Sequence, residues 1–301
     1  MKIGIVGAGG VGGYLAARLA KSGEEVYLVA RGEHLEAIEK EGLRLVMRDE
    51  EIVVHPTAVS DDAAEFGERM DAVLFCVKGY DLQDAAKKAA PMIGPDTLLV
   101  PFGNGVGNAQ TLRSIYPQNP VANGAVYIVS HIQRPGVVKV AGRGALAVIG
   151  TDGPVPQRLQ ALGDALKKAG IKTIVSDRIT TEVWKKFLLI AAMATLTSCH
   201  DAPMGEIVEK HKEELRKVLD EILAVGRAEG ARLDDGDKAK VLEQVAKVPY
   251  DSPTSMWLDF KAGRKTELEQ ITGYVVKKAR EHGIEVPTIA ACYEVLKSRQ
   301  S

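Results

Sequence analysis

Three glycines near the N-terminus stand at the spacing of a phosphate-binding loop. Gly7, Gly9 and Gly12 follow the apolar segment 1–6 and precede a helical pattern over 13–22. In this setting the first glycine permits a tight turn, the second lets the backbone approach a pyrophosphate, and the third lets the helix pack on the sheet. The amides that begin the helix favour negative charge.

We therefore expect this loop to bind a dinucleotide, and a glycine-rich turn that binds nothing is the simpler alternative. The expected cofactor-binding residues of the loop are Gly7, Ala8, Gly9, Gly10, Val11 and Gly12.

Arg31 follows a second apolar segment, 25–30, at the point where a cofactor without a ribose phosphate usually meets Asp or Glu. A guanidinium can donate two hydrogen bonds to phosphate oxygens. The sequence therefore favours NADP(H) over NAD(H). The alternative is a solvated Arg31 that pairs with Glu33.

A lysine in an apolar helical segment is the main candidate for acid–base chemistry. Segment 180–193 is too apolar for a helix that faces solvent. Lys186 shares its helical stripe with Ile179, Val183, Ile190 and Met193. Lys185 lies on a charged stripe, so Lys186 is the lysine that we expect to face inward. Desolvation would lower its pKa toward the range useful for proton donation. A surface ion pair between Glu182 and Lys186 is the alternative.

No pattern in the sequence predicts a metal site. His200 stands beside the carboxylate of Asp201 in sequence, but sequence neighbours on a helix do not face each other, so we expect a surface or helix-end role for it. The three cysteines are far apart in sequence, at Cys76, Cys199 and Cys292. They form neither a disulfide framework nor a paired metal motif. The acidic segment 234–237 lacks calcium-loop spacing and is expected to cap a helix.

Strand-like and helical patterns alternate over the first part of the chain. The apolar runs 70–77 and 97–102 read as buried strands, and Lys78 and Asn104 stand at their ends. This alternation predicts a parallel sheet that binds ligands at the carboxyl ends of its strands. Short runs between glycine or proline turns predict antiparallel strands added to this sheet, at 124–132, 137–141 and 145–149.

Beyond residue 176 the pattern is helical throughout. The candidate helices are 179–199, 206–229, 237–248, 254–262, 267–282 and 288–299. We therefore expect two domains, a Rossmann-type α/β domain over 1–176 and an all-helical domain over 177–301.

The net charge of the chain and the lengths of its apolar runs limit the kinds of binding partner that we expect. The 39 basic and 40 acidic residues nearly cancel, which offers no field for nucleic acid. The longest apolar run, 187–196, is too short to span a bilayer, and segment 1–6 is too short for a signal peptide. We expect a cytoplasmic protein with a small-molecule substrate and neither a nucleic-acid nor a membrane partner.

The whole chain resembles the ketopantoate reductase (2-dehydropantoate 2-reductase) family. Beside the glycine loop with Arg31, the resemblance rests on Val77-Lys78, Asn104-Gly105, Trp184-Lys185-Lys186, Ser255-Met256 and Thr266-Glu267. It implies NADPH-dependent reduction of 2-dehydropantoate, a 2-oxo acid, to (R)-pantoate in the pathway to pantothenate and coenzyme A. It also implies a Rossmann domain followed by a helical domain like that of 6-phosphogluconate dehydrogenase, with the site in the cleft between them.

The resemblance also implies roles for single residues. Lys186 would donate a proton to the carbonyl oxygen, and Glu267 would set up the substrate and the lysine. Asn104 and Ser255 would contact substrate, and Asn104 would also border the cofactor. Lys78 would serve the cofactor together with the arginine after the second strand. A homodimer through the helical domain is expected by the same analogy.

Each of these positions also has a local interpretation. Asn104-Gly105 is a common turn, Ser255 could cap a helix, and Glu267 could belong to the exposed Arg264-Lys265 cluster.

The chain departs from the family pattern at two positions. Members commonly carry asparagines one and two turns after the lysine, where this chain has Ile190 and Ala194. Hydrogen-bonded recognition gives large selectivity, so the change puts the substrate in doubt. The alternatives are a related reductase of another branched or bulkier 2-oxo acid, and a non-catalytic NADP(H)-binding sensor.

Overall fold

In the computed structural model, which describes residues 1–300, the N-terminal segment forms a strand, a helix and a second strand in the predicted order. These are β1 (Lys2–Val6), α1 (Gly10–Lys21) and β2 (Glu25–Val29). The helix begins at Gly10, earlier than the predicted Gly13, and Gly13 donates its amide to the carbonyl of Gly9. The second half of the glycine motif is therefore the first turn of α1.

The first sheet is parallel, as the alternating pattern predicts. Its strand order is β5 (Ala58–Ser60), β2, β1, β6 (Ala72–Phe75) and β7 (Leu98–Pro101). The central strands are almost entirely apolar, as expected for a sheet that is covered on both faces. In β6, for example, Ala72 and Leu74 belong to one core cluster, whereas Val73 and Phe75 belong to another. β5 is too short to leave a pattern in the sequence, and the prediction omitted it.

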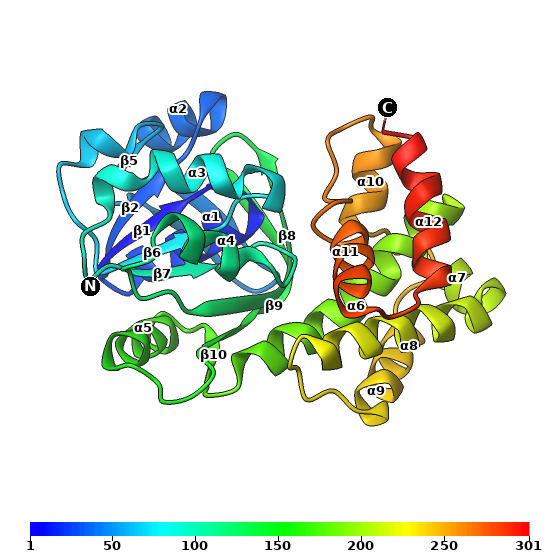
Figure 1. The fold of residues 1–301 in the computed structure, drawn as a ribbon. Coiled ribbons are helices and arrows are strands. Elements are labelled where there is room, and N and C mark those ends of the chain that lie inside the picture. The colour runs from blue at the N-terminus through cyan, green and yellow to red at the C-terminus, as the bar shows by residue number, and fades with distance from the viewer. Residues whose placement is uncertain (301) are drawn as a thin grey trace. The chain divides into compact units, whose positions relative to one another are not determined.

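A second sheet lies on the other side of α1, which packs against strands of both sheets (Figure 1). Its order is β10 (Lys172–Ser176), β9 (Val137–Gly150), β3 (Leu43–Val46) and β4 (Glu51–Val54), with β8 (Asn123–Arg134) paired to β9. The prediction that the later strands extend the first sheet is therefore wrong. Among the described residues an isolated bridge joins Leu99 of β7 to Val121, which lies two residues before β8.

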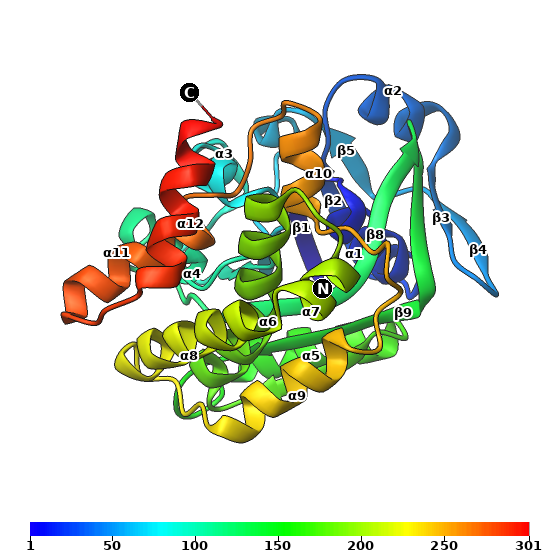
Figure 2. The same cartoon turned by 90° about the vertical axis from the view of Figure 1, so that its right-hand side faces the viewer.

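The predicted turn at 142–144 is also absent. β9 runs through these residues as one strand, and Figure 2 shows β8 and β9 as a long ribbon that passes beside β3. Gly142 and Gly144 have φ angles of +104° and +144°, and the pairing register with β8 shifts between Tyr127 and Val129. The glycines therefore accommodate an irregularity within the ribbon, since glycine tolerates positive φ.

Helices complete this part of the chain. α3 (Leu82–Lys88) and α4 (Asn108–Ile115) cover one face of the first sheet, and α5 (Gln157–Lys168) packs on β10 and β9. α2 (Gly32–Glu41) begins soon after β2.

The chain forms two compact units that do not follow sequence order strictly. One comprises Met1–Gly103 and Asn108–Ile179, and the other comprises Asn104–Gly107 and the chain from Thr180 onward. The sequence pattern predicts a single domain boundary at residue 176, and no local pattern indicates that Asn104–Gly107 pack with the C-terminal unit.

The C-terminal unit is helical, as predicted. Its helices are α6 (Ile179–His200), α7 (Met204–Lys210), α8 (Lys212–Ala228), α9 (Asp235–Val245), α10 (Ser255–Lys261), α11 (Thr272–His282) and α12 (Pro287–Ser298). α8, α11 and α12 pack against one another, and α6 supplies much of the buried core. Asp234 and Asp237 form a capping box at α9, which confirms the predicted cap.

Two predicted helices differ from the structure. The predicted helix 206–229 is broken at His211, which ends α7 and begins α8, although no proline or glycine marks the break. The predicted helix from Glu267 begins instead at Thr272, because turns at 267–271 precede it.

Within residues 1–300 no single helix has the length and apolar content to cross a membrane. α6 and α7 have the required length and apolar content only when they are counted together, and the two helices are bent by 86° at the break between them.

Candidate active site and dinucleotide loop

The three motif glycines each have the local geometry that the loop motif predicts. Gly7 has φ of +100°, which suits glycine in a tight turn. A Cβ on Gly12 would lie 1.8 Å from the Gly7 carbonyl oxygen, so no side chain fits there. A Cβ on Gly9 would meet nothing within 4 Å. The loop is therefore closed at Gly7 and Gly12 and open at Gly9, where a pyrophosphate needs close backbone approach.

The first turn of α1 adds donors at this opening. The amides of a helix's first turn have no intrahelical partner and favour an anion. Gly10 is also required here, because its Cβ would lie 2.4 Å from the Ser130 carbonyl oxygen in β8. These features of the loop fit the pyrophosphate of a dinucleotide.

The His34 side chain holds the glycine loop in place by hydrogen bonding. No pattern in the sequence indicates this role. Its Nε2 lies 2.9 Å from the Ala8 carbonyl oxygen, and its Nδ1 accepts the Gly136 amide at 2.9 Å. Because Nδ1 accepts, Nε2 must carry the proton and donate to Ala8. Burial lowers the pKa of His34, and the Ala8 contact opposes this, so the neutral ring is favoured.

Arg31 lies just beyond β2 and precedes the first residue of α2. Its side chain is exposed, and in residues 1–300 it makes no ion pair with Glu33. The guanidinium is thus available at the end of β2, where the sequence predicts contact with a ribose phosphate.

Lys186 lies on the buried side of α6. On its stripe Val183 and Met193 are buried and Ile190 is half-buried. The predicted alternative partner Glu182 pairs with Lys185 instead, at 3.0 Å. The structure thus separates the two lysines as helical spacing predicts.

The Lys186 ammonium has a defined acceptor. Its Nζ donates to Asn104 Oδ1 at 3.1 Å. Burial lowers the pKa of Lys186 to about 8, and the Glu267 carboxylate acts in the opposite direction. The group is therefore held close to the point where its proton can be given up at neutral pH.

Glu267 is almost fully buried, with a relative exposure of 2%. This burial does not fit the alternative that Glu267 belongs to an exposed Arg264-Lys265 cluster, and Arg264 pairs with Asp259 at 2.8 Å. Glu267 lies in the turn before α11 and adds its negative charge to the environment of Lys186.

The segment that carries Asn104 is shaped to pack with the helical unit. Gly105 has φ of +107°, which turns the chain directly after Asn104. Val106 packs against the apolar core of that unit. A Cβ on Gly107 would lie 2.8 Å from the Tyr274 ring, so this close approach requires glycine. The Asn104 amide is positioned by an anchored loop and is more than part of a generic turn.

The remaining predicted residues occupy helix beginnings. Lys78 is half-buried and follows β6 at the start of a short 3₁₀ helix, Gly79–Asp81. Ser255 is exposed and is the first residue of α10. The local alternative that Ser255 caps this helix is wrong, because Thr254 is the N-cap and accepts the Trp257 amide.

Ile190 and Ala194 continue the Lys186 face of α6 by one and two turns. Ile190 is half-buried and Ala194 is 3% exposed. Neither side chain can donate or accept a hydrogen bond, so this face beyond the lysine is apolar.

Comparison with known proteins covers both units. The family model described as "Ketopantoate reductase PanE/ApbA" matches residues 3–152, and its C-terminal counterpart matches residues 178–300. A 2-dehydropantoate 2-reductase of Archaeoglobus fulgidus is 31% identical, with 94% of this chain and 92% of the relative covered. An uncharacterized oxidoreductase of Bacillus subtilis, YkpB, is 28% identical over 97% of both chains.

A solved structure shows a similar fold. The PanE/ApbA family ketopantoate reductase from Ralstonia eutropha JMP134 has a TM-score of 0.91 and 33% identity, and the match covers 100% of this chain and 98% of that one. The ternary structure of D-mandelate dehydrogenase with NADH and anilino(oxo)acetate, at 22% identity and a TM-score of 0.88, shows a likeness of fold alone.

Substitution of alanine at Gly9 and at Gly12 should have different effects, one on cofactor binding and the other on the stability of the fold. We expect Gly9→Ala to keep the melting temperature and to weaken NADPH binding at least about tenfold, about 1.4 kcal/mol, because a methyl group would occupy the pyrophosphate approach. Gly12→Ala should destabilise the fold by about 1–3 kcal/mol through overpacking. Thermal melts and a fluorescence titration with NADPH measure both effects. Native NADPH affinity in Gly9→Ala would contradict the assignment of the loop.

Proposed function

We propose, from the premise that this chain belongs to the ketopantoate reductase family, that it reduces 2-dehydropantoate to (R)-pantoate with NADPH. The chain is an oxidoreductase of this type, with a small-molecule substrate, and the identity of that substrate is the proposed part. The observation that carries the proposal is the half-buried Lys186 ammonium, whose Nζ lies 3.1 Å from Asn104 Oδ1.

In this proposal Lys186 acts as the general acid. Its ammonium donates a hydrogen bond to the substrate carbonyl oxygen, which polarises the carbonyl, and gives up a proton as negative charge develops there. The neutral amine is then reprotonated from solvent. A pKa of about 8 suits this cycle, because the proton is present at neutral pH yet leaves more easily than from an exposed lysine.

Asn104 and Glu267 position and tune the lysine. The Asn104 amide oxygen fixes the direction of Nζ. The Glu267 carboxylate raises the pKa of Lys186 against the effect of burial, so that the ammonium stays charged. We propose that Asn104 and Ser255 also contact the substrate.

The cofactor residues lie in the N-terminal unit. We propose that segment 7–12 holds the pyrophosphate, Arg31 the ribose phosphate, and Lys78 another part of the cofactor, with Asn104 at its border. When bound, the nicotinamide supplies the hydride. The preference for NADPH rests on Arg31, because a 2′-phosphate matches its planar guanidinium and a 2′-hydroxyl does not.

The product (R)-pantoate places the enzyme in pantothenate and coenzyme A biosynthesis. We propose a cytoplasmic setting, with which the three free cysteines agree.

The homodimer stays a prediction from resemblance. A non-catalytic NADP(H) sensor is disfavoured, because a binding protein has no need of a desolvated lysine with an assigned acceptor.

Ile190 and Ala194 favour a second candidate function. Their apolar side chains extend the lysine face of α6 and would suit a 2-oxo acid with a bulkier hydrocarbon group. The second candidate is therefore the same reaction on another branched 2-oxo acid.

Removing Lys186 tests the catalytic assignment against its neighbour Lys185. We expect Lys186→Ala to lower kcat for ketopantoate at least about 100-fold, because general acid catalysis contributes about 10²–10⁴. Lys185→Ala removes an adjacent lysine of the same helix that pairs with Glu182, and its kcat should stay near the native value. NADPH absorbance measures both. An unchanged kcat in Lys186→Ala would show that this lysine is not the general acid.

Arg31→Ala tests the preference for NADPH. We expect KM for NADPH to rise about tenfold or more, and KM for NADH to stay within about twofold, since losing a phosphate contact of about 1.5 kcal/mol affects only the phosphorylated cofactor. Lys40→Ala removes an exposed charge from the last turn of α2, the helix that follows Arg31, and is the control. Equal changes in KM for NADPH and for NADH would show that Arg31 does not contact the 2′-phosphate.

A panel of 2-oxo acids separates the two candidate functions. The leading proposal predicts the highest kcat/KM for ketopantoate, and the second predicts it for a bulkier analogue with a larger apolar group. Steady-state rates with saturating NADPH decide between them. A wide margin for ketopantoate would eliminate the second candidate, and no turnover of any member would contradict both.

A further inference from the structure

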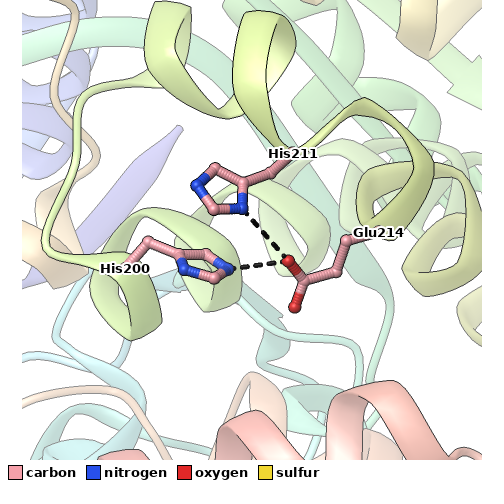
Figure 3. Close-up of side chains that lie close together, drawn as sticks. All are labelled: His200, His211 and Glu214. Carbon is pink, nitrogen blue, oxygen red and sulfur yellow. Dashed lines mark hydrogen bonds and ion pairs between the residues drawn. The ribbon is translucent and has the colours of Figure 1, made fainter.

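Two histidines and a glutamate converge in the C-terminal unit (Figure 3). Glu214 Oε2 lies 2.7 Å from His200 Nε2 and 3.4 Å from His211 Nδ1. The imidazole rings stack with centroids 3.7 Å apart, so their nitrogen-bearing edges face the same carboxylate. This is the one group of its kind found in residues 1–300.

Chain breaks bring these residues together. His200 is the last residue of α6, and His211 stands at the break between α7 and α8. Glu214 follows in the first turn of α8, three residues after His211 and on the same helical face. The contact of His200 with Glu214 could not be read from sequence, because it joins α6 to a residue 14 positions further along the chain.

The cluster lies far from the proposed catalytic lysine. Lys186 and His200 are both on α6, and their separation along the helix axis is roughly 21 Å at about 1.5 Å per residue. The cluster therefore belongs to a different site from the Lys186 site.

The donor set suits a divalent transition metal. Two imidazole nitrogens and one carboxylate oxygen are ligands that zinc accepts in sites that keep a fourth position open. Bonds of about 2.0–2.1 Å place tetrahedral ligand atoms about 3.3 Å apart. The His211–Glu214 separation of 3.4 Å already matches this spacing. Metal binding would require the His200–Glu214 contact to open by about 0.6 Å. The stacked rings, whose centroids are 3.7 Å apart, would also have to separate to roughly 5 Å, because each imidazole binds a metal in its own ring plane. Both changes are rotations of partly exposed side chains.

We propose that His200, His211 and Glu214 form a binding site for one divalent zinc-class metal ion, with water as the fourth ligand. The ion replaces the proton of the His200–Glu214 hydrogen bond, and this proton moves to the other ring nitrogen or to solvent. The bound ion pins the end of α6 to the α7–α8 break and stabilises the helical unit by mass action.

Two neighbouring features sharpen the test. Cys292 Sγ lies 3.9 Å from Glu214 Oε1, so zinc binding by a thiol has to be distinguished from binding by the cluster. Elsewhere in the same unit His282 Nε2 lies 2.7 Å from Glu229 Oε1. This pair repeats the histidine–glutamate contact outside the three-ligand group and is a matched control.

The experiment is a titration of the chelator-treated full chain with Zn²⁺, followed by calorimetry and thermal melting. We expect one ion per chain, a raised melting temperature and reversal by a chelator. His211→Asn and Glu214→Gln should each weaken binding at least about tenfold, as loss of a ligand from a three-ligand site requires. His282→Asn and Cys292→Ser should bind zinc as the native chain does.

The outcomes are decisive in either direction. Absence of binding to the native chain would overturn the proposal, as would equal binding by the native chain and both ligand variants. Loss of binding in Cys292→Ser alone would assign the ion to the thiol and overturn it as well. The use of two ligand variants guards against a folding defect in either one, which circular dichroism would reveal.

Discussion

The hydrogen bond from Lys186 to Asn104 is the contact on which the proposed active site depends. Burial in the apolar face of α6 favours the neutral amine, and the Glu267 carboxylate opposes that effect, so the ammonium is kept charged but easily deprotonated. Asn104 gives this charge a fixed direction. It can do so because Gly105, Val106 and Gly107 pack the loop with the helical unit, although the chain enters that loop directly from β7.

The glycine loop at residues 7–12, the proposed dinucleotide site, is held by a separate set of contacts. Gly7 and Gly12 bring backbone atoms too close for any side chain, while Gly9 stays open. A neutral His34 then ties the loop to the turn between β8 and β9 through Ala8 and Gly136. The second sheet therefore contributes to the loop's position although it supplies none of the motif residues.

Local patterns revealed much of the fold and the candidate site because their causes are local. The parallel sheet follows from apolar runs such as that of β6, and the inward position of Lys186 follows from helical spacing. Contacts between distant segments left no such signal. The His34 clamp, the break at His211 and the passage of β9 through its glycines depend on tertiary partners that no short pattern encodes. Glu267 is intermediate: resemblance selected it, but only the structure shows that it is buried.

A direct titration of Lys186 is the sharpest test of the central claim that this lysine is held in a desolvating environment beside Asn104 and Glu267. With ε-carbon-labelled lysine and assignment by Lys186→Arg, the chemical shift of its side chain can be followed against pH by NMR. The structure predicts a midpoint at about 8, well below the value of 10.5 for an unperturbed lysine, and a further fall in Glu267→Gln because the supporting negative charge is removed. A midpoint at or above 10.5 would contradict the account, because it would mean that the ammonium is solvated like any surface lysine.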